Sequence, residues 1–196
     1  MHSIDLIREN PTRSRDRVLA HVEDMRDHAL VFPTVNGGGH TLWVLGHLAY
    51  IEALVVEGFM LGRRNLLAAW EEPFDGAGTS ADPTRYPPFD EVRATCREQR
   101  ERTLALLATL GEADLDGPSA NTPTGFADTF GTSRHCLQYV ADHWYMHRGQ
   151  LADAPRRRPE SRVVRRPGRG RHGGLLPGPL VRDRRGRPHG RRATRR

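Results

Sequence analysis

Hydrophobic residues recur at helical spacing in four stretches of the chain, and strand-like alternation does not extend over any length. The last stretch is the clearest, because apolar or ring-bearing residues follow one another there at steps of three and four: Cys136, Val140, His143, His147 and Leu151. This spacing places the five side chains on one face of a helix over about residues 134–151. The other three helices are predicted over about residues 10–28, 42–61 and 89–110.

The first predicted helix has two alternative starts, because Pro11 stands close to its beginning. Asn10 can cap a helix that has proline as its first residue. Alternatively, one helix runs continuously from Asp5 and kinks at Pro11. In either case we expect the helix to end near His28.

The second predicted helix is apolar nearly all round and is long enough to cross a membrane. However, His47, Glu52 and Glu57 interrupt it, and the sequence offers no second span. We therefore interpret it as a buried helix of a bundle and expect no membrane contact. Gly46 lies in its middle, where the missing side chain would let another helix approach closely.

Two long connections, residues 71–88 and 116–131, are rich in proline, glycine and polar residues. Long connections without secondary structure are uncommon inside compact domains. For residues 71–88 a reason exists if the two helices that they join run parallel, because the connection must then return along a whole helix. The sequence thus predicts an all-α fold, a four-helix bundle over residues 1–154.

The last part of the chain has a different composition from the rest. Residues 155–196 hold sixteen of the 30 basic residues and two of the 24 acidic ones, so this tail carries a net charge of +14 and residues 1–154 carry −8. Arginine, glycine and proline dominate the tail, which therefore cannot bury enough apolar surface and is expected to be disordered. The abrupt change at Pro155, with no lysine anywhere in the chain, favours a frameshift product over an evolved RNA-binding arm. We expect at most non-specific contact between this tail and nucleic acid.

The two cysteines, Cys96 and Cys136, fall inside predicted helices. Their number and placement argue against a disulfide framework and favour small core residues over nucleophiles. Charged residues among the first ten positions leave no room for the apolar run of a signal peptide. We therefore expect a cytoplasmic protein.

Histidines supply the candidate chemistry. His143 and His147 are one helical turn apart on the apolar face, so both rings can reach one metal ion. His47 is a third histidine in the middle of a nearly all-apolar helix. A single core histidine with satisfied ring nitrogens is the commoner situation, and from spacing alone the two interpretations remain open.

Three further residues are candidates for the surroundings of such a site. His40 lies two turns before His47 on the same helix face and could line the mouth of the site. Glu52 is either a buried hydrogen-bond partner or a carboxylate outside the ligand shell. Arg148 follows the histidine pair and could meet a substrate carboxylate, although a solvent-exposed arginine is an equally good interpretation.

Two motifs resemble those of the DinB-like (DinB/YfiT) superfamily. LGHLAYIE, residues 45–52, is similar to the Gly-His-x-x-x-x-Glu of that family's second helix, and DHWYMHRGQL, residues 142–151, is similar to the His-x-x-x-His of its last helix. The resemblance implies a four-helix bundle of up-down-down-up topology. It also implies a divalent metal ion held by three histidines, which fall on His47, His143 and His147.

The resemblance also implies an activity. Characterised relatives include metal-dependent thiol transferases, so we expect a thiol S-transferase-type enzyme that joins a low-molecular-weight thiol to an electrophilic substrate. The alternative is a non-catalytic, stress-related metal-binding bundle. The metal would be zinc, nickel or iron, since imidazole suits all three. Relatives are often homodimers, which makes a second copy of the chain an expected partner.

Overall fold

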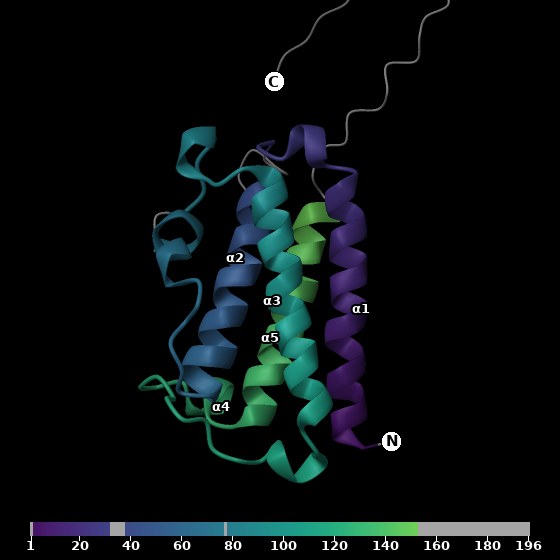
Figure 1. Ribbon diagram of the computed structural model, residues 1–196, viewed down its shortest axis with the longest axis vertical. Helices are drawn as coiled ribbons and strands as arrows, with labels where there is room; N and C mark the ends of the chain where they lie inside the picture. Colours follow the sequence, from purple (N-terminus) through teal and green to yellow (C-terminus); the bar gives the residue numbers. More distant parts are fainter. Residues whose placement is uncertain (1, 32–37, 77, 153–196) are drawn as a thin grey trace, which may run out of the picture. The chain divides into compact units, whose positions relative to one another are not determined.

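The structure, a computed structural model that describes residues 2–31, 38–76 and 78–152, is a bundle of four long helices (Figure 1). These helices are α1 (Ser3–Glu23), α2 (Thr41–Ala53), α3 (Phe89–Thr109) and α5 (Ser133–Ala152). Helices α1 and α5 run in one direction and α2 and α3 in the other (Figure 1). The predicted all-α fold and its up-down-down-up topology are confirmed.

Helix α1 is continuous through Pro11, which is buried inside it. Of the two alternatives from the sequence, the structure therefore has the continuous helix. Proline lacks the N–H that would bond to the carbonyl group of Ile7, so one helical hydrogen bond is missing at this point. The helix ends at Glu23, earlier than expected, and a 3₁₀ turn, η1 (Arg26–His28), follows it.

Helix α2 continues directly into a π-helical segment, η2 (Leu54–Met60). Together, Thr41–Met60 are long and apolar enough to cross a membrane by length and composition, but 67% of this stretch is buried inside the protein. Such burial is the property of a core helix, and it supports the interpretation of a buried bundle helix.

The connection between α2 and α3 returns along the outside of α2, as expected for parallel neighbours (Figure 1). It is more structured than predicted, since it contains the short turns η3 (Ala68–Trp70), η4 (Glu72–Gly76) and η5 (Pro83–Arg85). Phe74 and Tyr86 anchor it by entering the core. The connection between α3 and α5 likewise contains a 3₁₀ turn, η6 (Glu112–Asp114), and a short helix, α4 (Ala127–Phe130).

The hydrophobic core consists of two clusters, one toward each end of the bundle. One cluster includes Val18, Leu45, Val92 and Trp144, and the other includes Ile7, Val56, Leu107 and Val140. Between them along the helices lies a set of buried polar residues, which we call the polar layer: Ser14, Glu52, Gln99, Arg100, Thr103 and His143. The polar middle of the third predicted helix is therefore part of the interior.

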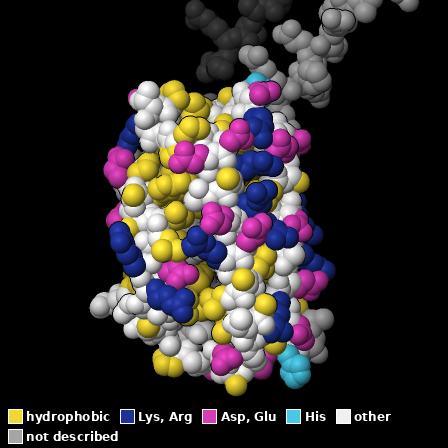
Figure 2. All heavy atoms as spheres, viewed as in Figure 1, with side chains coloured by type: hydrophobic (Ala, Val, Ile, Leu, Met, Phe, Trp, Pro, Cys, Tyr) yellow, Lys and Arg dark blue, Asp and Glu magenta, His cyan; other side chains and the backbone are white. Residues whose placement is uncertain are grey.

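Arginine and acidic side chains alternate over the face of the bundle shown in Figure 2. Several of them form ion pairs, such as Arg93 with Glu23 at 2.9 Å and Arg102 with Glu98 at 2.7 Å. These charges are therefore largely compensated by their neighbours. The predicted tail, residues 155–196, and its expected disorder lie outside the described residues.

Candidate metal centre

The structure brings together the three histidines that the sequence singled out. His47 comes from α2, and His143 and His147 come from successive turns of α5. Each offers one ring nitrogen, and these atoms all lie within 4.8 Å of one another. His143 and His147 are 6% and 4% exposed, so the group is largely shielded from solvent. We call these residues the three-histidine group.

Carbonyl oxygens orient two of the three imidazole rings. His47 Nδ1 lies 2.7 Å from the backbone oxygen of Phe74, and His147 Nδ1 lies 2.8 Å from Oε1 of Gln150. Because a carbonyl oxygen can only accept a hydrogen bond, each Nδ1 carries the proton and donates it. The lone pair of each ring is therefore on Nε2, which is the arrangement that metal-binding histidines adopt.

Burial keeps the three imidazoles neutral. Burial, followed by the neighbouring His147 and His47, lowers the pKa of His143 to about 2. Burial and then His47 lower the pKa of His147 to about 4, and burial also lowers the pKa of His47. Neutral imidazole is the form that binds metal ions, so at neutral pH no positively charged imidazolium has to lose a proton before a metal ion binds.

The spacing of the nitrogens fits a shared cation. His147 Nε2 and His143 Nε2 are 3.0 Å apart. Bonds of about 2.0–2.1 Å to zinc place two ligand nitrogens roughly 3–4 Å apart. Among the described residues the group contains three ligands and no carboxylate or thiol, so a bound ion would keep open coordination positions.

Aromatic rings stack on two of the three imidazoles. The indole of Trp43 stacks on His47, with ring centroids 4.4 Å apart and an interplanar angle of 12°. Tyr139 stacks on His143 at 5.6 Å and 13°. These contacts limit rotation of both imidazoles and cover their faces with apolar surface.

The sequence of the bundle identifies its family. Residues 12–151 match the family described as the DinB superfamily, and this match covers both histidine motifs. The chain belongs to the DinB superfamily. No curated protein sequence matches it. The resemblance of residues 45–52 and 142–151 to DinB-like motifs is thereby confirmed at the level of the family.

Glu52 lies in the interior of this DinB bundle, where it is 1% exposed. Its Oε2 atom accepts a hydrogen bond from the indole Nε1 of Trp144 at 2.8 Å and lies 2.9 Å from Nη2 of Arg100. Glu52 thus meets α3 and α5 through side chains that do not belong to the three-histidine group. A role for it toward a metal ion stays a prediction.

His40 and Arg148 occupy different surroundings from each other. His40 is the N-cap of α2: its Nδ1 accepts a hydrogen bond from the backbone N–H of Trp43, and its Nε2 lies 2.7 Å from the backbone oxygen of Ser80. These contacts cap a helix and anchor the following connection. Arg148 has a buried Nε for which no hydrogen-bond partner is found in the described part of the chain. The predicted roles of both residues at the site stay predictions.

Sequence reasoning missed several residues of the site. Gln150 could have been found, because it lies three positions after His147 on the same helix face. Phe74 could not, since it contributes a backbone oxygen from a connection without periodic pattern. Asp75 was missed for the same reason. Its Oδ1 lies 3.9 Å from His47 Nδ1, and burial raises the pKa of its carboxyl group.

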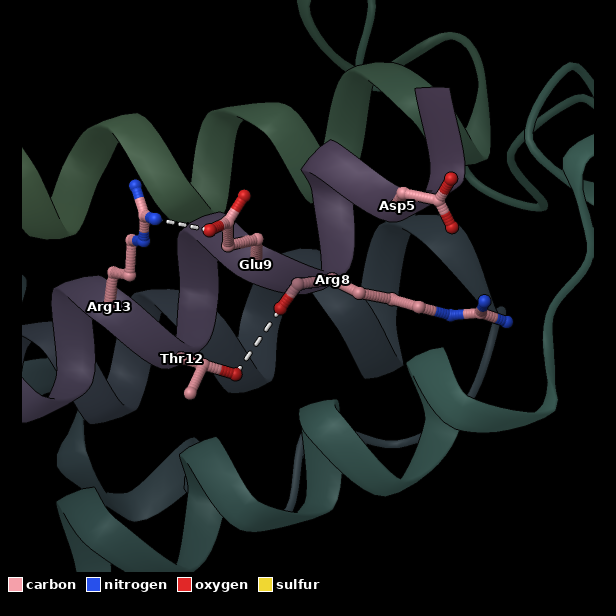
Figure 3. Close-up of a pocket in the computed structure, with 5 residues that line it drawn as sticks. All are labelled: Asp5, Arg8, Glu9, Thr12 and Arg13. Carbon is pink, nitrogen blue, oxygen red and sulfur yellow. Dashed lines mark hydrogen bonds and ion pairs between the residues drawn. The ribbon is translucent and has the colours of Figure 1, made fainter. Parts of the chain in front are cut away.

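A hollow of about 540 Å³ lies on the outer face of α1, and none of the residues that line it belongs to the three-histidine group (Figure 3). It is lined by Asp5, Arg8, Glu9, Thr12 and Arg13. Arg13 pairs with Glu9, Arg8 donates to backbone oxygens at the end of α3, and Asp5 accepts from the backbone N–H of residue 2. Because these charges are already satisfied and no metal-binding cluster is present among them, we do not assign the hollow a chemical role.

Proposed function

We propose that this DinB superfamily member is a divalent-metal-dependent enzyme of the thiol S-transferase type, acting with a low-molecular-weight thiol in the cytoplasm. The observation that supports it most directly is the convergence of three neutral imidazoles from two helices. Three protein ligands leave coordination positions open, as catalytic metal sites do and closed structural sites do not.

A divalent cation bound there would supply Lewis acidity, which lowers the pKa of a thiol from about 8.5 and yields a nucleophile near neutral pH. The chain's own residues prepare the site for this role. The Phe74 carbonyl group and the Gln150 side chain keep the lone pairs of His47 and His147 on Nε2. Trp43 covers one face of His47, and the carboxyl group of Asp75 lies near the same ring, with its Oδ1 3.9 Å from Nδ1.

The proposal is tested in two stages with the purified full-length chain. Elemental analysis should find about one divalent ion per chain, and the His143→Ala, His147→Ala double variant should retain less than a tenth of it. The metal-loaded protein is then assayed for loss of free thiol with a panel of small thiols and electrophiles, with the double variant as the control.

Turnover that depends on the histidines supports the enzyme. One ion per chain without turnover across the panel would instead favour the non-catalytic metal-binding protein. The low exposure of His143 and His147 is the observation that speaks for this second function. Absence of metal binding would contradict both.

A further inference from the structure

The polar layer that divides the hydrophobic core contains a cluster of charge and aromatic surface. Arg100 of α3 is fully buried, and its Nη2 lies 2.9 Å from Oε2 of Glu52 on α2. The same oxygen accepts the hydrogen bond from the indole N–H of Trp144 on α5 at 2.8 Å. The guanidinium carbon of Arg100 lies 4.1 Å from the centre of the Trp144 ring. We call these three residues the Glu52–Arg100–Trp144 cluster.

The Glu52–Arg100–Trp144 cluster is expected to contribute little to the stability of the fold. Burial raises the pKa of the Glu52 carboxyl group and lowers that of the Arg100 guanidinium, because both charged forms lose their hydration. In the described part of the protein, Glu52 Oε1 and all three guanidinium nitrogens of Arg100 also lack hydrogen-bond partners, so Arg100 meets Glu52 only as an ion pair. A buried ion pair of this kind is often no more stabilising than apolar residues of similar size. Its presence in mid-bundle therefore calls for a second explanation.

The position of the cluster supplies that explanation. Trp144 directly follows His143 on α5, and Glu52 follows His47 on α2 by little more than one helical turn. The two helices that carry the three-histidine group are thus joined a second time by the bond between Trp144 and Glu52. Any rotation of α5 about its axis that displaced His143 would also break this bond. Arg100 holds the Glu52 carboxylate in place from the third helix.

We propose that the Glu52–Arg100–Trp144 cluster positions His143 relative to His47 and so sets the metal affinity of the three-histidine group. Glu52, Arg100 and Trp144 are positioning residues, since none of them belongs to the group itself. The inference rests on the proposed metal site but not on the proposed transferase activity. It concerns the geometry of the apoprotein as well as the bound state.

The test uses Trp144→Phe, which removes the indole N–H and keeps an aromatic ring beside Arg100. Leu107→Ala is the matched control. Leu107 is buried in the hydrophobic cluster that also contains Ile7 and Val140, so its truncation destabilises the bundle without removing any group of the Glu52–Arg100–Trp144 cluster. The dissociation constant for Zn²⁺ is measured by competition with a chelator, at a temperature where each variant is folded. The visible spectrum of the Co²⁺-loaded protein reports ligand geometry.

We expect Trp144→Phe to weaken Zn²⁺ binding about 10-fold or more, as loss of a residue that orients metal ligands does, and to change the Co²⁺ spectrum. Leu107→Ala should lower the melting temperature and leave both properties unchanged. Equal Zn²⁺ affinity and equal Co²⁺ spectra in Trp144→Phe and wild type would overturn the inference. Equal losses of affinity in Trp144→Phe and Leu107→Ala would also overturn it, because the effect would then follow stability.

A second, milder variant tests the same inference if Trp144→Phe does not fold. The Thr103 hydroxyl group, which donates to the backbone oxygen of Gln99 at 3.3 Å, partly offsets the raised pKa of the Glu52 carboxyl group, and Thr103→Val removes this hydroxyl group at nearly constant volume. We expect a weaker change of Zn²⁺ affinity in the same direction, and faster solvent exchange of the Trp144 indole proton in the metal-free protein. Unchanged affinity together with unchanged exchange would contradict the proposed positioning role of the cluster.

If the wild-type chain binds no divalent ion, the proposed function and this inference fail together. If it binds one without turnover, only the transferase activity fails.

Discussion

A Cβ atom at Gly46 would lie only 2.1 Å from Cε1 of the Phe74 ring. Phe74 is fully buried, and its backbone oxygen accepts the hydrogen bond from His47 Nδ1. Gly46, which leaves room for the Phe74 ring, and His47, which donates to the Phe74 oxygen, are therefore consecutive residues of α2. From the sequence, Gly46 was expected to admit another helix, whereas the structure places an aromatic ring of the connection there.

Replacement of Gly46 by alanine should disturb both stability and metal binding. The new methyl group must displace the Phe74 ring, and overpacking of this kind costs about 1–3 kcal/mol in the free energy of unfolding. Displacement of Phe74 also moves the carbonyl group that orients His47, so the metal content should fall. Urea denaturation and elemental analysis measure the two effects.

Gly149→Ala is the matched control for this substitution. A Cβ atom at Gly149, which also lies inside a helix, would meet nothing within 4 Å. Alanine there should raise the free energy of unfolding by up to about 1 kcal/mol through helix propensity and leave the metal content unchanged. If Gly46→Ala and Gly149→Ala had the same metal content, metal binding would not require the orientation of His47 by Phe74.

Single substitutions test whether the three histidines act as one site. His47→Ala should abolish high-affinity metal binding as fully as His143→Ala does, because two imidazoles bind a divalent ion much more weakly than three. His135→Ala is the control, since His135 is an exposed histidine on the same helix as the pair. The measurement is metal per chain after dialysis against a weak chelator. Retention of one ion by His47→Ala would show that α2 does not supply a ligand.

Removal of one partner from the buried ion pair should be costly. Arg100→Met leaves the Glu52 carboxylate buried without its cation, and such changes cost about 3–5 kcal/mol in the free energy of unfolding. The control is Arg102→Met, which breaks the exposed pair with Glu98 and should cost less than about 1 kcal/mol. Denaturant titration of both variants gives the comparison. Similar values for the two would mean that the interior of the bundle tolerates the unpaired carboxylate.

The parts of the fold that could be predicted were those that follow from periodicity. The i, i+4 spacing of His143 and His147 is a property of one helix, so the sequence alone placed both rings on the same face. The long connection between parallel helices followed from helix length, and its path along α2 agrees with that argument. His47 needed knowledge of which helices pack together, and only the resemblance to a DinB-like motif supplied it.

The parts that escaped prediction depend on tertiary contacts. Arg100 stands in a polar stretch of α3, where charge normally indicates solvent exposure, yet it is fully buried because Glu52 and Trp144 face it from two other helices. The end of α1 was misplaced because the turn at Arg26–His28 continues the helical pattern at 3₁₀ spacing. Residues 155–196 lie beyond both the described structure and the family match, so their expected disorder stays a prediction.

The two cysteines should be unreactive in the folded protein. Burial, with a further contribution from the charge of Glu52, raises the pKa of the Cys96 thiol, and burial also raises that of Cys136. Thiol reagents attack the thiolate, whose population falls as the pKa rises. At pH 8 we therefore expect no reaction with an aromatic disulfide reagent in native conditions, and two thiols per chain in denaturant, where both cysteines regain an ordinary pKa. Cys96→Ala should reduce the denatured value to one thiol and leave the native value at zero. Rapid reaction of one thiol in the native protein would contradict this prediction, and its loss in Cys96→Ala or in Cys136→Ala would identify the reactive cysteine. The protein's own thiol, rather than a small-molecule thiol, would then be a candidate nucleophile.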